Sequence, residues 1–136
     1  MEKYDLQTIG FMTTFEKITQ VHVKRFFVDK RGQLVFIVEE GQAGKAIGKS
    51  GMHIRKLQHL LKKRIRVVEY TQDPKEFVKS YISPLQVESI TLKEDKLTLS
   101  SKDMKVKGLL IGRDRQNLKE LNVIMQKLFK IDVIVV

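Results

Sequence analysis

Hydrophobic and polar positions along the chain alternate between two kinds of spacing, one typical of helices and one typical of strands. Apolar residues recur at every third position through much of residues 4–19, which indicates a helix. Residues 21–28 and 33–39 are rich in β-branched and aromatic side chains and are separated by Asp29-Lys30-Arg31-Gly32, a composition typical of a hairpin turn. The elements expected in the first half are helix 4–19, strands 21–28 and 33–39, helices 42–47 and 52–63, and strand 65–70.

The second half of the chain repeats this order of elements. A shift of 64 residues places Ile47-Gly48-Lys49-Ser50 on Ile111-Gly112-Arg113-Asp114 without a gap. Asp73-Pro74 suits the junction, because proline is tolerated at the first position of a helix. The elements expected in the second half are helix 75–82, strands 85–92 and 97–101, helices 106–111 and 115–129, and strand 131–136. We therefore expect an α/β (α+β) fold of two units, residues 1–72 and 73–136, each with the order α-β-β-α-α-β.

The composition excludes several classes of protein. The chain has no cysteine, which excludes disulfides, thiol nucleophiles and Cys-ligated zinc, and its three histidines are too poorly spaced for a metal site. The apolar runs are far shorter than the roughly 20 residues that a membrane-spanning helix needs, and residues 1–5 lack the pattern of a signal peptide. We expect a cytoplasmic binding protein with no cofactor, no metal, no membrane contact and no small-molecule substrate.

Positive charge is concentrated in one part of the chain. The formal net charge is +10, from 26 basic and 16 acidic side chains. Residues 41–68 contain no acidic side chain, and their basic residues are Lys45, Lys49, Arg55, Lys56, Lys62, Lys63, Arg64 and Arg66. A solvated helix face usually carries both signs of charge. A run of this length without a carboxylate favours a surface that binds an anion, and the polyphosphate backbone of a nucleic acid is the commonest such partner.

One segment within this run satisfies a relaxed phosphate-loop pattern. Residues 43–50 read Ala-Gly-Lys-Ala-Ile-Gly-Lys-Ser. A loop that binds nucleoside phosphates leaves a buried strand directly, whereas here two carboxylates, Glu39 and Glu40, precede the segment. The equivalent loop of the second half also lacks the Lys-Ser pair. A small nucleotide-dependent enzyme is therefore the less favoured alternative, and we expect no enzymatic activity.

The segment Gly48-Lys49-Ser50-Gly51 is better interpreted as a tight joint between two helices. The two glycines allow positive φ and leave room for a nucleic-acid strand to approach the main chain. The helix that follows directs its free N–H groups toward a phosphate, and Lys49 supplies a mobile countercharge. A plain helix–helix turn is the alternative, and it explains neither the basic run nor the repeat.

The stretch Ala-Ile-Gly-Lys-Ser-Gly-Met-His-Ile, residues 46–54, resembles the signature of the K-homology (KH) domain, a family that binds single-stranded nucleic acid. The order of elements resembles the type II arrangement, which implies a three-stranded mixed sheet covered by helices in each unit. Over essentially its full length the chain is similar to the archaeal family of NusA-like transcription factors, for example at residues 15–19 and 73–78. The resemblance implies binding to single-stranded nascent RNA, a role in transcription elongation or termination, and RNA polymerase as a partner.

Candidate RNA-binding residues lie in and beside both loops. They are Lys45, Ile47, Gly48, Lys49, Ser50, Gly51 and Arg55 in the first unit, and Gly112, Arg113 and Arg115 in the second. In the second loop the carboxylate of Asp114 repels phosphate, and left-handed backbone geometry would cost Arg115 more steric strain than it costs glycine. We expect the first unit to be the main RNA clamp and the second to add weaker contacts or support. A ribosomal or ribosome-assembly KH protein is the other alternative.

Overall fold

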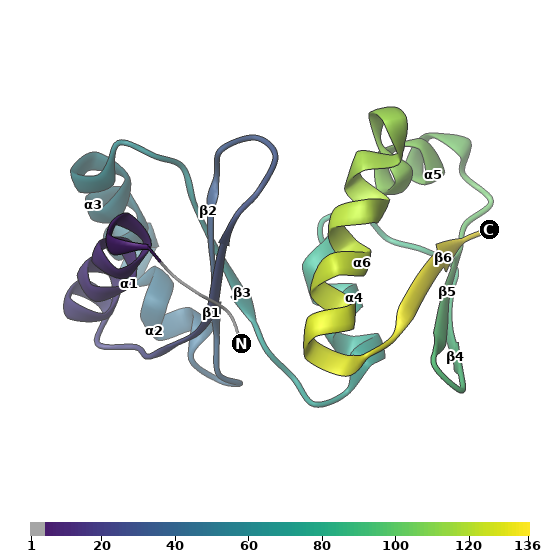
Figure 1. Ribbon diagram of the computed structural model, residues 1–136, viewed down its shortest axis with the longest axis horizontal. Coiled ribbons are helices and arrows are strands. Elements are labelled where there is room, and N and C mark those ends of the chain that lie inside the picture. The colour runs from purple at the N-terminus through teal and green to yellow at the C-terminus, as the bar shows by residue number, and fades with distance from the viewer. Residues whose placement is uncertain (1–4) are drawn as a thin grey trace. The chain divides into compact units, whose positions relative to one another are not determined.

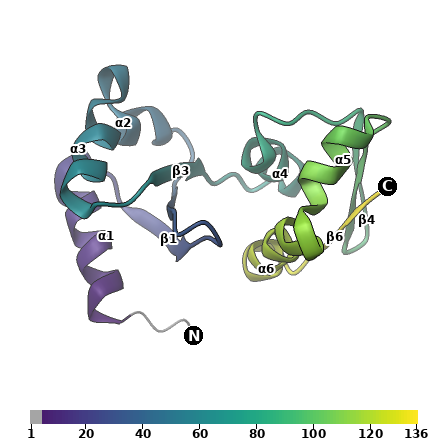
Figure 2. The same cartoon turned by 90° about the horizontal axis from the view of Figure 1, so that it is seen from above.

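The computed structural model describes residues 5–136, and these divide into two compact units at the boundary between Thr71 and Gln72. The boundary between the units lies one residue before the one expected from the sequence. Helices α1, α2 and α3 cover one face of the first sheet, and helices α4 and α6 cover one face of the second (Figure 1; Figure 2 is the view from above). The expected mixed α/β fold with two three-stranded sheets is confirmed.

The first unit has the expected order of helices and strands. Its elements are α1 (Leu6–Thr19), β1 (Val23–Val28), β2 (Leu34–Val38), α2 (Ala43–Ile47), the short 3-10 turn η1 (Lys49–Gly51), α3 (Met52–Leu61) and β3 (Ile65–Glu69). The helix start expected near residue 4 lies outside the described residues; α1 begins at Leu6, because the Asp5 carboxylate accepts a hydrogen bond from the Thr8 N–H at 2.7 Å. In the sheet, β2 is central, antiparallel to β1 and parallel to β3.

The second unit repeats this topology. Its elements are α4 (Pro74–Ile82), β4 (Ser89–Lys93), β5 (Lys96–Ser100), α5 (Met104–Ile111), η2 (Arg113–Arg115), α6 (Gln116–Phe129) and β6 (Asp132–Val135). Central strand β5 is antiparallel to β4 and parallel to β6. Two boundaries of the second unit differ from expectation by two residues or more. Strand β4 begins at Ser89 instead of residue 85, because a turn closed by the Leu85 N–H and the Ile82 carbonyl (2.9 Å) follows α4. Helix α5 begins two residues early because Asp103 caps it.

The core of the first unit is built around aromatic rings that join α1 to the sheet. Phe15 of α1 and Phe36 of β2 are fully buried, with ring centroids 4.2 Å apart. Phe26 of β1 lies 4.9 Å from Phe36 and 6.0 Å from Phe11 of α1. Burial of each such ring stabilises the fold by roughly 1.5–3 kcal/mol, and the offset ring contacts add to this. The stack holds α1 against the sheet and leaves α2 and α3 to carry the loop between them.

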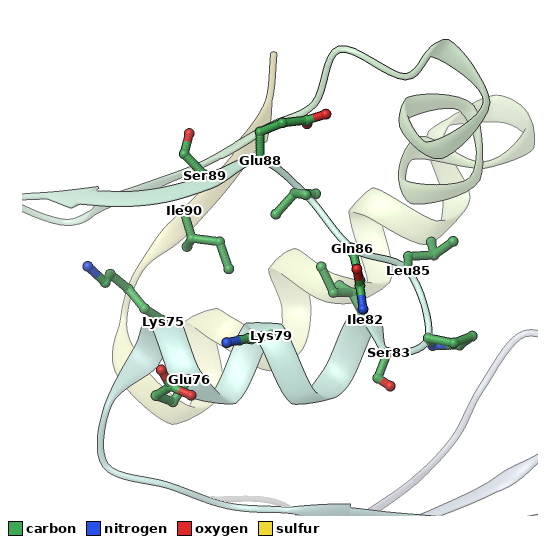
Figure 3. Close-up of a pocket in the computed structure, with 12 residues that line it drawn as sticks. Lys75, Glu76, Lys79, Ile82, Ser83, Leu85, Gln86, Glu88, Ser89 and Ile90 are labelled. Carbon is green, nitrogen blue, oxygen red and sulfur yellow. The ribbon is translucent and has the colours of Figure 1, made fainter.

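The equivalent part of the second unit is less completely filled. Phe36 and Leu99 hold equivalent positions in the central strands β2 and β5. Phe36 pairs with the fifth residue after Lys62, and Leu99 pairs with the fifth residue after Lys130. Lys62 and Lys130 are the left-handed residues that end α3 and α6. The edge-strand partners of Phe36 and Leu99 are Phe26 and Ile90. At the positions of these two phenylalanines the second unit has smaller side chains, and an open groove of about 670 Å³ lies beside α4 and Ile90. Figure 3 shows Ile90 pointing from β4 into this space.

Candidate nucleic-acid interface

The chain turns between α2 and α3 through a loop with unusual backbone conformations. Gly48 ends α2 with φ 80° and ψ 167°, and Ser50 and Gly51 follow with φ values of 56° and 75°. The Gly51 N–H donates to the Gly48 carbonyl at 3.0 Å, which closes the turn. Three of four consecutive residues therefore have left-handed φ values, so the main chain of the loop follows a path that an ordinary sequence avoids.

Gly48 is required at its position for two independent reasons. A φ near 80° combined with a ψ near 167° is a conformation essentially restricted to glycine. A Cβ atom placed on Gly48 would also lie 2.9 Å from both Cγ and Nδ1 of His53, and 3.0 Å from the His53 backbone nitrogen. Any side chain at position 48 would therefore displace the first turn of α3.

His53 passes over Gly48 and ties the two helices together. Its Nδ1 lies 3.0 Å from the Lys45 carbonyl oxygen in α2. A carbonyl oxygen only accepts hydrogen bonds, so Nδ1 carries the hydrogen in this contact. The bond joins the start of α3 to α2 across the residue that has no side chain. Sequence reasoning did not assign a role to His53.

Arg55 holds the loop from the other side. Its guanidinium donates a hydrogen bond to the Ser50 carbonyl. A Cβ atom on Gly51 would lie 3.4 Å from the Arg55 Nη1, an ordinary contact with the end of a flexible side chain. Arg55, which was expected to contact RNA, thus also fixes the conformation of the loop.

The remaining candidate side chains of the first unit surround the loop and are open to solvent. Lys45, Lys49 and Ser50 are exposed, and Ile47, the last residue of α2, is 39% exposed. Within residues 5–136 neither Lys45 nor Lys49 forms an ion pair. The loop therefore presents open main chain bordered by two ammonium groups that carry no internal countercharge.

The start of α3 has no side-chain cap. Helices α1, α4 and α5 are capped by the carboxylates of Asp5, Asp73 and Asp103, respectively. Helices α3 and α6, which follow the two loops, begin after Gly51 and Arg115 with no side-chain hydrogen bond to their first N–H groups. The N–H groups of Met52 and Gln116 donate to the carbonyls of Lys49 and Arg113. The positive end of the helix dipole makes such a helix start suitable for a phosphate.

The second loop has the same backbone conformation as the first, although its residues differ. Gly112 has φ 77° and ψ 172°, and Asp114 and Arg115 have φ values of 55° and 61°. The Arg115 N–H donates to the Gly112 carbonyl at 3.1 Å, which matches the bond that closes the first loop. The steric strain expected at Arg115 therefore does not change the path of the chain. The left-handed conformation of a non-glycine residue costs roughly 1–2 kcal/mol.

Asn117 takes the place of His53 in the second unit. Its Nδ2 donates to the Leu109 carbonyl oxygen at 2.8 Å, and a Cβ atom on Gly112 would lie 2.6 Å from its Cγ. The positions 45 and 109, and the positions 53 and 117, are related by the same shift of 64 residues as the loops. The signal was present in the sequence as a nitrogen-bearing side chain five residues after the first glycine of each loop.

The side chains of the second loop give it a different charge from the first. Arg113, Asp114 and Arg115 are all exposed, so two cations accompany one carboxylate at the surface. The two loops thus share one backbone shape and differ in the charge that they present to an anion.

Within residues 5–136 no group of three acidic or histidine side chains could hold a metal ion. No helix in that range has the length and hydropathy needed to cross a membrane.

Comparison with known proteins identifies similar chains. A family model described as the KH domain matches residues 12–97, a range that contains α2, the first loop and α3. The probable transcription termination protein NusA of Methanocaldococcus jannaschii is 29% identical over 137 residues, covering 96% of this chain and 73% of the relative. The protein of the same name in Methanococcus vannielii is 33% identical over 92 residues, covering 68% of this chain and 53% of the relative.

A solved structure is also similar along the chain. The crystal structure of APE1850 superimposes with a TM-score of 0.75 and 32% sequence identity, covering 98% of this chain and 100% of that one.

Proposed function

This chain belongs to the KH domain family, and from that premise we propose that it is a transcription elongation or termination factor of NusA type that binds single-stranded RNA. Membership of the family and relatives named as NusA support an RNA-binding transcription factor that is not an enzyme. The preference for single-stranded RNA and the residues that bind it are parts of the proposal.

The observation that carries the proposal is the open main chain of the first loop. Gly48 and Gly51 allow the left-handed path that leaves Lys49 and Ser50 exposed, and the positive end of the α3 dipole lies beside them. Lys45 and Lys49 border the loop without internal ion pairs among the described residues. A sugar–phosphate backbone can lie against such a surface through hydrogen bonds to the main chain and charge contacts to the lysines. Binding of this kind depends on the phosphates and is independent of the identity of the bases.

We propose that the two compact units are tandem KH domains with unequal roles. The first unit is the main RNA clamp, through the candidate residues Lys45, Ile47, Gly48, Lys49, Ser50, Gly51 and Arg55. The second unit contributes weaker contacts through Gly112, Arg113 and Arg115, because the Asp114 carboxylate opposes the phosphate that its backbone would otherwise accept. The shared backbone geometry of the two loops supports a common role for both.

RNA polymerase is the proposed protein partner, and the cytoplasm is the proposed location. Both rest on the relatives named as probable transcription termination proteins, one of which is similar over 96% of this chain. A termination assay with the cognate RNA polymerase measures this part of the proposal. Addition of the protein is expected to change the fraction of transcripts released at a terminator.

RNA binding is tested by fluorescence anisotropy with labelled single-stranded oligonucleotides. Lys49→Asp is expected to weaken binding by about tenfold or more, because it removes a charge-assisted contact and adds repulsion at the phosphate site. The loss is expected for every oligonucleotide sequence. The matched control is Lys30→Asp, which makes the same charge change in the exposed β1–β2 turn and is expected to have little effect.

Three results would contradict the proposal. They are equal losses in the two variants, a loss confined to one RNA sequence, and tight binding or hydrolysis of ATP or GTP. Co-sedimentation with ribosomal particles instead of RNA polymerase would replace the transcriptional role with one in ribosome assembly.

A further inference from the structure

The outer face of α3 carries basic side chains in addition to those beside the glycine loop. The exposed residues of this helix and its end recur at intervals of three and four, and they are Met52, Arg55, Lys56, His59, Leu60, Lys62 and Lys63. Arg55 also bonds to the Ser50 carbonyl of the loop. Leu57, on the opposite side of the helix, is fully buried in the core. The basic face is therefore directed away from the body of the first unit, and it begins at the glycine loop and continues to the far end of the helix.

This face has no internal countercharge in the described part of the first unit. Residues 41–68 contain no acidic side chain, and seven of their eight basic residues are exposed, Arg66 being the exception. The carboxylates of Glu16 and Glu39 contact His22 and Lys24, respectively, and neither contact involves α3. Three further carboxylates make hydrogen bonds to backbone N–H groups elsewhere, those of Asp5, Asp29 and Glu69.

The second unit shows that the fold does not require these cations. The shift of 64 residues places Lys56, His59 and Lys62 of the first unit on Glu120, Val123 and Gln126. Helix α6 nevertheless packs in the same topology, with Leu121 buried where α3 has Leu57. Lys119 and Lys127 keep cations at the positions of Arg55 and Lys63, so α6 is less positive on this face than α3 but not uncharged. The more positive face belongs to the unit whose loop is best suited to phosphate.

We propose that the outer face of α3 is a second RNA contact surface, along which the strand leaving the glycine loop continues, with Lys56, Lys62 and Lys63 binding its phosphates. The proposal rests on the function proposed above and adds to the loop a surface that only longer RNA reaches. Lys56 and Lys62 are six residues apart, which is about 9 Å along a helix axis. Their ammonium groups therefore contact different phosphates of the same strand.

The test compares RNAs of about five and about twelve nucleotides, since the loop alone contacts about four. The triple variant Lys56→Gln, Lys62→Gln, Lys63→Gln removes three charges and adds none. We expect binding of the short RNA to change by less than about twofold and binding of the long RNA to weaken by about tenfold. The slope of log affinity against log salt concentration for the long RNA should become less steep by about 2, which corresponds to three lost contacts at about 0.7 each.

The matched control is Lys119→Gln, Lys127→Gln, Lys130→Gln, which removes three exposed charges from α6 and its end. Lys62 and Lys130 are the left-handed residues that end α3 and α6, so each triple variant also replaces one lysine at a left-handed helix end by glutamine. The control is expected to leave the binding of both RNAs nearly unchanged. Equal losses in the two variants would overturn the proposal, because they would reflect net charge alone.

Unchanged binding of the long RNA by the α3 variant would also overturn the proposal, and would point to an acidic protein as the occupant of this face. The function proposed above is judged separately, by RNA binding of the unaltered chain and its loss in Lys49→Asp. If the triple variant unfolds, the single variant Lys56→Gln replaces it, with an expected decrease in salt slope of about 0.7 for the long RNA alone.

Discussion

The conformation of the first loop depends on a small number of mutually dependent residues. Gly48 leaves the space that the His53 ring occupies, and the ring in turn reaches the Lys45 carbonyl at 3.0 Å. Arg55 holds the Ser50 carbonyl. Each contact fixes the main chain that is proposed to meet RNA, so the side chains that shape the site are distinct from those that supply its charge.

His53 is therefore predicted to position the loop. His53→Ala removes the bond across Gly48 and should weaken RNA binding by about three- to tenfold, the range expected for one hydrogen bond. His53→Asn should restore most of the affinity, because Asn117 makes the same contact in the second unit. Anisotropy titrations measure both. An asparagine variant as weak as the alanine variant would show that the ring acts in another way.

At the scale of helices and strands, apolar spacing, β-branched composition and the internal repeat predicted the α-helices, the β-strands and their order, but not the 3-10 turns η1 and η2. Errors occurred where local hydrogen bonds set the boundary. Leu85 and Val87 give residues 85–88 the composition of a strand, yet a turn over residues 82–85 is followed by irregular chain, and β4 begins at Ser89. Helix α5 starts early because of the Asp103 cap. Periodicity reports which face of an element is buried, whereas its ends depend on single polar groups.

The groove beside α4 leads to a prediction about the stability of the second unit. Ile90→Phe places an aromatic ring where the first unit has Phe26, and should stabilise the protein by about 0.5–2 kcal/mol by filling space and burying apolar area. Thermal and denaturant unfolding measure the change. Ile134→Phe is the control, because Ile134 pairs with Thr98 on the face of the same sheet that is away from Leu97 and Leu99. Similar gains in both variants would contradict the prediction.

For the whole molecule, the main feature is one loop shape made by two different sequences. Gly48 and Gly112 match in φ and ψ within a few degrees, as do Ser50 and Asp114. The second unit therefore retains the geometry of the proposed phosphate site and changes its electrostatics. This supports a division of roles in which the units differ in affinity for RNA.

Exchanging the loop residues should transfer affinity between the units. Ser50→Asp with Gly51→Arg copies the second loop into the first and should weaken RNA binding by about tenfold, because a carboxylate enters the phosphate site. Asp114→Ser with Arg115→Gly does the reverse, and should strengthen binding and stabilise the chain by roughly 1–2 kcal/mol as left-handed strain is relieved. Anisotropy and denaturant unfolding measure the two effects. Changes of the same sign and size in both variants would argue against unequal roles.

The sequence predicted which residues form the candidate site but not how they are held. Glycine spacing, the basic run and the repeat were sufficient to locate both loops. The contacts of His53 and Asn117 were not predicted, because they depend on the angle between two helices, which local patterns do not report. The left-handed conformation of Arg115 was not predicted either, because backbone strain at one residue is outweighed by the packing of α5 and α6 around it.

The pairing of Gly112 with Asn117 has a consequence for how such loops are recognised in other chains. A search that demands glycine at both ends would pass over the second unit, although its main chain follows the same course. Both copies fit another pattern, in which the first glycine is followed five positions later by a side chain whose nitrogen can donate a hydrogen bond. Ancient duplicates whose last glycine has been replaced could be recovered by that criterion.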